Sequence, residues 1–198
     1  MKTNLEYIRA FLGEKGDSEP LFSDAEITDV MNGHLIHQID LALARKLSRS
    51  GVDYKVVDDT GLLRIKLKRL ATAPDGFVEF YAGVGNWQDN AGNVYLNDLF
   101  HYLRPTESID YLHGILRLSA PLPPSPKVEV EVYLLDIKGV LIELLEILRS
   151  SRAKLAIKAG LAGVEVDLSQ VQAQIEKEIQ ALMGSYELEI IPWEDYPH

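Results

Sequence analysis

The sequence predicts an α+β fold, in which a helical body of about five helices from the two ends of the chain carries a large antiparallel β insert in the middle. Near both ends, apolar residues recur every three or four positions, as on the buried face of a helix. Between residues 52 and 135 they recur every second position, as in a strand with one buried face. Helix-capping signals precede the helical segments.

Residues 1–51 are predicted to form the N-terminal helical part. The first helix begins at the T-x-x-E signal Thr3-Asn4-Leu5-Glu6 and ends at Gly13, since glycine adopts the left-handed conformation that closes many helices. A later helix of this part ends at Gly51 for the same reason. Its apolar face comprises residues at helical spacing: Leu35, Ile36, Ile39, Leu43 and Leu47.

The helix between these two carries the strongest local signal in the chain. Ser23 and Glu26 stand three apart, the spacing at which an N-cap residue and its partner satisfy each other's backbone amides in a capping box. Phe22 and Ile27 flank them, where a hydrophobic staple packs. Asn32-Gly33 ends the helix. The sequence therefore predicts a well-defined helix start at Ser23.

Residues 52–135 are predicted to form the β-rich insert. Residues 63–68 and 127–134 alternate between apolar and charged side chains, and the charged face is basic in the first segment and acidic in most of the second. Shorter strands are expected at residues 77–81 and 114–119. The opposite charges of the two longer segments predict cross-strand ion pairs, each worth a few tenths of a kcal/mol.

Residues 136–184 are predicted to form the C-terminal helical part, packed with the N-terminal one. Apolar residues return to helical spacing after the insert, and a run of small residues at 160–163 breaks the helix. Asp167 is the expected N-cap of a last helix. The apolar residues of that helix share one face: Val171, Ile175, Ile179 and Leu182.

Composition limits the classes of function. The chain has 30 acidic and 20 basic side chains, and its formal net charge of −10 disfavours general binding to nucleic acid but suits a channel through which DNA slides. The absence of cysteine excludes disulfides, thiolate metal sites and cysteine nucleophiles. The first residues lack the apolar core of a secretory signal, and no apolar run reaches the length of about 20 residues that a membrane span needs. We expect a soluble protein made in the cytoplasm.

Several segments together resemble the head–tail connector (adaptor) proteins of tailed bacteriophages. Such connectors begin with a short helix ending in Gly, continue with a capped helix, and finish with a helix after a loop of small residues. The segments that carry the resemblance lie at both ends of the chain and in two strands: Ile8-Arg9-Ala10-Phe11-Leu12-Gly13, Leu21-Phe22-Ser23-Asp24-Ala25-Glu26-Ile27, Leu41-Ala42-Leu43-Ala44, Tyr111-Leu112-His113-Gly114-Ile115-Leu116-Arg117-Leu118, Val130-Glu131-Val132-Tyr133, Arg152-Ala153-Lys154, Lys158-Ala159-Gly160 and Val166-Asp167-Leu168-Ser169-Gln170.

The resemblance implies a structural virion protein of the neck, made in the host cytoplasm and without enzymatic activity. Such a protein forms a homo-oligomeric ring of about twelve subunits on the portal. It passes DNA through its lumen without specific binding and docks the next neck or tail protein. The long β insert departs from the compact, nearly all-helical connectors, so another neck protein or a tail-completion protein is the alternative within the virion.

Candidate partner-binding residues lie in the C-terminal third. In the tail, residues 185–198, Leu188 and Ile190 alternate with glutamates as in an edge strand, which pairs either within its own chain or with a neighbour. Pairing with a neighbour is preferred, and Trp193 and Tyr196 are then expected to anchor in the partner. A second group is basic: Arg149, Arg152, Lys154 and Lys158. It either contacts acidic residues such as Glu14, Asp17 or Glu19 of an adjacent subunit or forms a solvated face that complements the helix dipole. Contact with phosphate is a third, less favoured alternative.

Enzymatic alternatives have weaker patterns. His34, His37 and Asp40 stand three apart, which on one helical face could hold a metal in a small carboxylate- or metal-dependent hydrolase or nuclease. A solvated or interface face is the preferred interpretation. Paired carboxylates such as Glu143 and Glu146 are routine on solvated helices. We find no nucleophile–base pattern, and predict no catalytic residue, no metal and no cofactor.

The insert contains further motifs of low specificity. Gly83-Val84-Gly85 resembles half a phosphate loop but lacks the Lys-Ser/Thr that follows one, so a hairpin loop is preferred. Residues 89–93 have oxygen ligands near a glycine without the spacing of a calcium loop, which favours a turn. Trp87, Tyr81 and Tyr95 either form a contact platform for a carbohydrate or protein or pack in the core, and packing is preferred.

Overall fold

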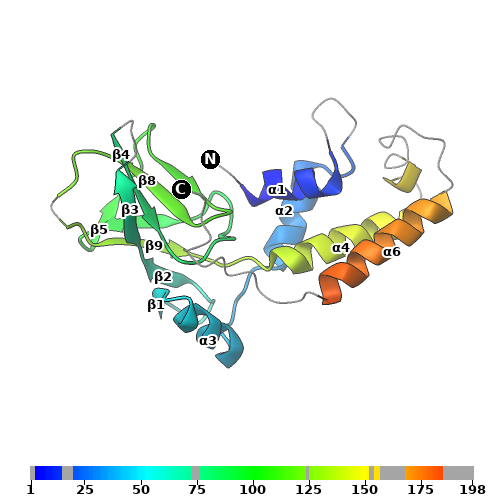
Figure 1. Cartoon of the computed structure of the whole chain (residues 1–198), viewed down its shortest axis with the longest axis horizontal. Helices are drawn as coiled ribbons and strands as arrows, with labels where there is room; N and C mark the ends of the chain where they lie inside the picture. The colour runs from blue at the N-terminus through cyan, green and yellow to red at the C-terminus, as the bar shows by residue number, and fades with distance from the viewer. Residues whose placement is uncertain are drawn as a thin grey trace. The chain divides into compact units, whose positions relative to one another are not determined.

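The order of elements in the computed structural model confirms the predicted α+β class, with helices toward both ends and strands between them (Figure 1). The structure describes residues 3–14, 20–72, 76–123, 125–151, 154–156 and 168–184. The chain divides into two compact units, one built around Leu35–Leu135 and the other around Leu5–His34 and Asp136–Leu188. We call the first the sheet unit and the second the helical unit, and describe each by itself.

The sheet unit contains two antiparallel sheets. The strands of the first sheet, in spatial order, are β1 (Asp53–Val56), β2 (Leu63–Lys66), β9 (Val128–Val132), β5 (Asn93–Leu96) and β6 (Leu99–His101). The strands of the second are β3 (Lys68–Thr72), β4 (Phe77–Tyr81), β8 (Ile115–Ser119) and β7 (Ser108–Asp110). Ile109 of the second sheet and Val132 of the first both lie 3.6 Å from where a Cβ on Gly92 would stand, so side chains of the two sheets meet in one core.

The predicted pairing of basic and acidic faces is confirmed in the first sheet. In the ladder of β2 and β9, Arg64 lies opposite Glu131 and Lys66 lies opposite Glu129. The Arg64 guanidinium forms an ion pair with Glu131 and stacks 4.1 Å from the ring centre of Tyr95. Leu63 and Ile65, which point to the other face of β2, are fully buried. The alternation therefore set both the face and the partner of this strand.

Helix α3 (Leu41–Arg49) belongs to the sheet unit and begins later than the sequence predicts. The Asp40 carboxylate caps it by accepting a hydrogen bond from the Leu43 amide at 2.7 Å. The prediction that Leu35, Ile36 and Ile39 belong to the helix is wrong, because all three precede it. Leu35 forms a β-bridge with Leu135, and the Ile36 amide donates to the Leu134 carbonyl at 2.9 Å, so the segment is held extended by backbone bonds to a distant part of the chain.

The loop after β4 is not a hairpin loop, because it connects β4 of the second sheet to β5 of the first. Its backbone lies against residues 111–114: the Asn86 amide donates to the Leu112 carbonyl, and the Trp87 amide donates to the Tyr111 carbonyl. A Cβ on Gly85 would lie 2.1 Å from the Leu112 carbonyl oxygen. Gly85 is therefore required by close backbone packing, and neither a phosphate site nor a tight turn explains it.

The three aromatic residues of the insert do not form an exposed contact platform, and the preferred interpretation, packing, agrees with their burial. Trp87 is fully buried, Tyr81 is buried, and Tyr95 is half-buried beneath Arg64. The loop at residues 89–93 has the left-handed residue Asn90 (φ 58°) and a hydrogen bond from the Ala91 amide to the Gln88 carbonyl. This geometry agrees with the predicted turn.

The helical unit is built from α1 (Asn4–Leu12), α2 (Asp24–Gly33), α4 (Ile137–Ser150) and α6 (Leu168–Gly184). Gly13, with φ +79°, ends α1 as predicted. Helix α4 packs on both α2 and α6, and it is buried along one face. The side chains of that face are Val140, Leu141, Leu144, Leu145 and Leu148, to which α6 adds Ile175 and Ile179. The predicted cap Asp167 lies outside the described residues.

None of the described helices is long and apolar enough to cross a lipid bilayer.

Candidate partner-binding surfaces

The N-terminus of α2 confirms the predicted capping box. The Ser23 hydroxyl accepts a hydrogen bond from the Glu26 amide at 3.2 Å, and the Ser23 amide donates to Glu26 Oε2 at 2.7 Å. Phe22 and Ile27, the two residues of the predicted staple, are both buried. The entry into α2 is thus held by its own sequence before any other element contributes.

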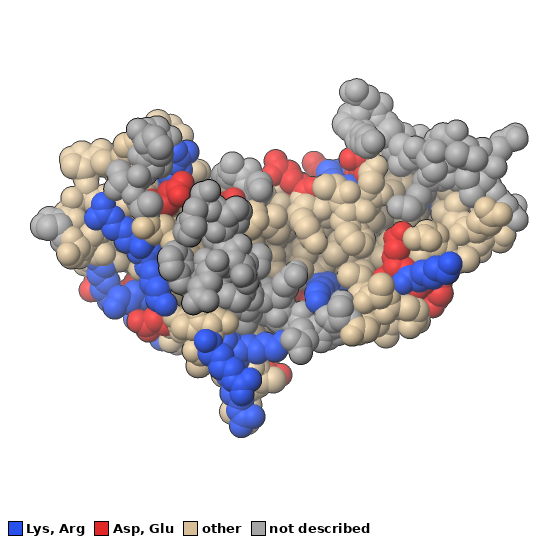
Figure 2. Space-filling view, viewed as in Figure 1, with Lys and Arg blue, Asp and Glu red and all other residues tan. Residues whose placement is uncertain are grey.

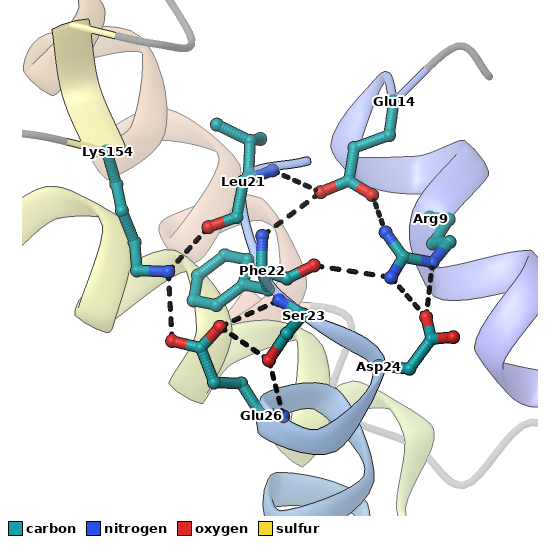
Figure 3. A network of polar contacts seen from close by, with 8 residues as sticks. All are labelled: Arg9, Glu14, Leu21, Phe22, Ser23, Asp24, Glu26 and Lys154. Carbon is teal, nitrogen blue, oxygen red and sulfur yellow. Dashed lines mark hydrogen bonds and ion pairs between the residues drawn. The ribbon is translucent and has the colours of Figure 1, made fainter. Parts of the chain in front are cut away.

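Lys154, one of the predicted partner-binding residues, contacts this helix start (Figure 3). Its ammonium donates to the Leu21 carbonyl at 2.5 Å, lies 3.1 Å from Glu26 Oε1 and stands 4.1 Å from the ring centre of Phe22. The ammonium of this one side chain therefore makes a hydrogen bond, an ion pair and a cation–π contact. Lys154 therefore fastens the short helical turn at 154–156 to the start of α2.

Glu14, just beyond the end of α1, binds the same segment before α2 through hydrogen bonds. Glu14 Oε1 accepts hydrogen bonds from the amides of Leu21 and Phe22, at 2.8 and 3.3 Å. The other oxygen of Glu14 pairs with Arg9, which also pairs with Asp24 (Figure 3). Partial burial alone would lower the pKa of Arg9, but these two carboxylates raise it. We call Arg9, Glu14, Asp24, Glu26 and Lys154 the α2 clamp.

The electrostatics of the α2 clamp favour the ionised form of Glu26. The backbone amide of Ser23 makes the largest contribution, followed by the hydrogen bond from Lys154, and together they lower the pKa of Glu26 to about 2. Because the folded pKa lies below the ordinary value, the stabilisation is complete at neutral pH. It is lost as the pH falls through the range between the two values.

Replacing Lys154 by Met will raise the pKa of Glu26 from about 2 toward, but not up to, its ordinary value of 4.5, because the hydrogen bonds from Ser23 remain. A side-chain carboxyl NMR titration of Glu26 measures the change. Arg149→Met is the matched control, since Arg149 forms its ion pair with Glu176 of α6, which is not a clamp residue. An unchanged Glu26 pKa in Lys154→Met would show that the lysine does not govern this site.

Arg149, the other predicted residue within the described chain, lies in the last turn of α4. It pairs with Glu176 of α6, and the Gln172 side chain donates to its carbonyl at 3.3 Å. Both Arg149 and Lys154 thus have acidic partners within the same chain, and a contact from either to an adjacent subunit stays a prediction. The remaining predicted residues lie outside the described residues: Arg152, Lys158, Leu188, Ile190, Trp193 and Tyr196.

The proposed metal-binding face of His34, His37 and Asp40 is not formed. Helix α2 ends at Gly33, so His34 is its C-cap residue and lies 2.7 Å from Glu143. The His37 ring lies 3.1 Å from the Thr60 carbonyl oxygen, while Asp40 caps α3. Across the described ranges, no three His, Asp or Glu side chains form a group that could hold a metal ion. No single helix contains all three residues, so their spacing does not place them on one helical face.

An exposed apolar strand at the end of the first sheet was missed from the sequence. Strand β6 pairs with β5 alone among the described strands, so its outer edge is unpaired there. Apolar side chains on and just after it are exposed: Leu99 (73%), Phe100 (47%), Tyr102 (82%) and Leu103 (37%). The sequence contains a hairpin signal here, Asn97-Asp98 between two apolar runs. Both residues adopt positive φ (51° and 67°), as a two-residue hairpin turn requires.

The aromatic residues of this β5–β6 hairpin stack on one another. Phe100 packs edge-on against Tyr95, with ring centres 5.8 Å apart, and against Tyr102, with ring centres 4.6 Å apart. Such pairs hold the exposed rings in place, so less conformational entropy is lost when a partner covers them. We call Leu99, Phe100, Tyr102 and Leu103 the β6 edge.

Comparison of the chain with protein-family models, with curated proteins and with solved structures found no match in any of the three.

Proposed function

We propose that this protein is a structural component of the neck of a tailed bacteriophage, a head–tail connector that assembles as a ring on the portal. In this role it passes DNA through the lumen and docks the next neck protein, without chemistry of its own. The proposal joins the resemblance of the chain to connector proteins with one structural observation that supports it, the β6 edge.

The β6 edge has the properties of an assembly surface. An unpaired strand edge offers backbone donors and acceptors to another strand, and proteins usually protect such edges with lysine, proline or a covering element. Residues 99–103 contain neither lysine nor proline. Instead the edge presents apolar and aromatic side chains, which are enriched at the centres of protein interfaces. A partner strand bound at this edge would pair with its free backbone groups and cover its apolar side chains.

In a ring, a neighbouring subunit would cover the apolar side chains of this edge. In a closed ring each subunit presents one surface to its neighbour and a different surface to the other neighbour, so the β6 edge needs a complement elsewhere on the chain. The tail offers one by sequence, because Leu188 and Ile190 alternate with glutamates as in a strand that adds to an exposed edge. Trp193 and Tyr196 follow it as anchors.

A tail-completion protein or another neck protein is the second candidate. The observation that favours it is the size of the β insert, which forms two sheets and a core of its own. The two candidates are both structural proteins, and they differ in the assembly to which the protein binds.

Native mass spectrometry of the purified protein, alone and mixed with a portal ring, tests the proposal. A closed oligomer, or stoichiometric binding to the portal, is the expected result. Binding to a tail tube instead of the portal would select the second candidate. A monomer that ignores both assemblies would contradict the proposal.

Substitutions at the β6 edge will reduce the assembly signal. In Leu99→Ser with Tyr102→Ser, we expect ring formation or portal binding to weaken by about tenfold or more, as for central residues of an interface. Leu41→Ser with Met183→Ser removes two other exposed apolar side chains and is the matched control. Equal assembly by the two double variants would show that the β6 edge is not an interface.

A further inference from the structure

A basic surface on the sheet unit is hidden by the acidic net charge of the chain. Residues 45–69 contain eight of the 20 Lys and Arg side chains and three of the 30 Asp and Glu side chains, so this stretch carries +5 in a chain of −10. It runs from α3 through β1 and β2 into β3. Figure 2 shows Lys and Arg side chains gathered over α3 and the strands beside it.

Part of this positive charge is balanced within the chain. Arg64 pairs with Glu131, and the Lys66 ammonium lies 3.9 Å from Asp53. Lys68 donates at 2.9 Å to the carbonyl of Gly51, just beyond the C-terminal end of α3. The last contact places the start of β3 next to the C-terminal end of α3.

Three cations on this surface have no hydrogen bond or ion pair within the described chain: Arg45, Arg49 and Lys55. All three are exposed. The hydrogen bond from Lys127 contributes most to the lowered pKa of the Asp98 carboxyl and Lys55 helps to lower it, but Asp98 forms its ion pair with Lys127. Arg45 and Arg49 stand four apart on the outward face of α3, away from its buried residues Leu43 and Leu47.

The arrangement brings like charges together. Cations at i and i+4 on a helix destabilise it by about 0.2–0.5 kcal/mol. Lys55 lies directly opposite Arg64 in the ladder of β1 and β2, where like charges also destabilise a sheet. The helix dipole favours Arg49 in the last turn of α3, but it does not explain Arg45 or Lys55. An external anion would remove this repulsion.

We propose that the surface formed by Arg45, Arg49 and Lys55 binds the phosphate backbone of duplex DNA, without regard to base sequence. Exposed cations around a helix face neutralise phosphates and release counterions, which supplies most of the free energy of such binding. Protein interfaces, in contrast, are depleted of charge at their centres. The proposal goes beyond the connector function and does not depend on it.

The test is the salt dependence of DNA affinity, measured by fluorescence anisotropy with a labelled duplex of random sequence. For the unaltered protein, we expect log Kd to depend linearly on log salt between about 50 and 200 mM, with a slope of about three or more. Arg45→Gln with Arg49→Gln will weaken binding about tenfold or more at the lowest salt and reduce the slope by about two. Adding Lys55→Gln will reduce the slope by about one more.

Lys138→Gln with Lys177→Gln is the matched control, because it makes the same change in net charge on the helical unit. Thermal unfolding of both double variants checks that the fold is retained. The proposal is overturned if the unaltered protein does not bind DNA at the lowest salt, or if the two double variants weaken binding equally. It is also overturned if Arg45→Gln with Arg49→Gln changes the oligomeric state and leaves DNA affinity unchanged, since the surface then binds a second copy.

Discussion

Replacing Gly85 by Ala will destabilise the sheet unit by about 3 kcal/mol or more, at the upper end of single-residue effects. A Cβ at this position would lie 2.1 Å from the Leu112 carbonyl oxygen, closer than any non-bonded contact allows. The neighbouring amides of Asn86 and Trp87 are bonded to the same opposing segment. Relief of the clash therefore requires breaking two backbone hydrogen bonds that fix the buried Trp87.

Urea unfolding followed by Trp87 fluorescence measures this loss, in a Trp193→Phe background so that one tryptophan reports. Gly76→Ala is the control within the same unit. Gly76 has φ +84° but no heavy atom within 4 Å of an added Cβ, so that variant loses only the backbone preference of glycine, about 1 kcal/mol. If the two variants lose equal stability, the close approach of the two backbone segments does not constrain Gly85.

Replacing Glu107 by Gln will destabilise the sheet unit by about 2–3 kcal/mol at neutral pH. The Glu107 side chain is 1% exposed. One of its oxygens accepts from the Arg104 amide at 2.9 Å and lies 2.8 Å from the His101 ring, and the other accepts from the Ser119 amide and hydroxyl at 3.0 and 2.7 Å. A glutamine offers only one acceptor oxygen, so either the Arg104 amide or the Ser119 amide faces its NH2 group and loses its acceptor.

The pH dependence of stability identifies the carboxylate as the cause. Burial alone raises the pKa of Glu107, but the hydrogen bonds outweigh it and lower the pKa to about 2. A lowered folded pKa stabilises fully above the ordinary value of 4.5 and loses that contribution as the pH falls toward 2. In Glu107→Gln the stability will therefore fall less steeply over this range than in the unaltered protein.

Glu79→Gln is the matched control, because Glu79 lies on β4 at the surface and only approaches Arg117, at 3.7 Å. An exposed pair of this kind contributes about 0–1 kcal/mol. An identical pH profile for Glu107→Gln and the unaltered protein would show that the buried carboxylate does not stabilise the fold. The experiment also tests the link between the two sheets, since His101 lies in β6 and Ser119 in β8.

The sequence determined the parts of this protein that depend on neighbours in the chain. The capping box at Ser23 and Glu26 and the stop at Gly13 are local, because the groups that satisfy the backbone are within a few residues. The alternation in β2 determined which of its two faces is buried. The sequence also places opposite charges at Arg64 and Glu131, which the pairing of β2 with β9 brings together.

Only the tertiary structure decided the features that depend on distant backbone. Residues 35–40 have helical spacing, but the bonds from Leu35 and Ile36 to residues 134 and 135 hold them extended. Three further features depend on segments that are distant in the sequence, and no sequence pattern shows which segments these are. They are the role of Gly85, the burial of Trp87 and the hydrogen bonds to Glu107.

The candidate surfaces divide in the same way. The alternating tail and the basic stretch of α4 could be read from residue order, because charge and apolarity are properties of single residues. The β6 edge could not, since an apolar strand becomes an exposed edge only when the sheet leaves it without a neighbour. Likewise, Lys68 reaches the end of α3 because the fold brings β3 there, and the pairing of β1 with β2 places Lys55 opposite Arg64. Long-range backbone pairing therefore decides which charges meet.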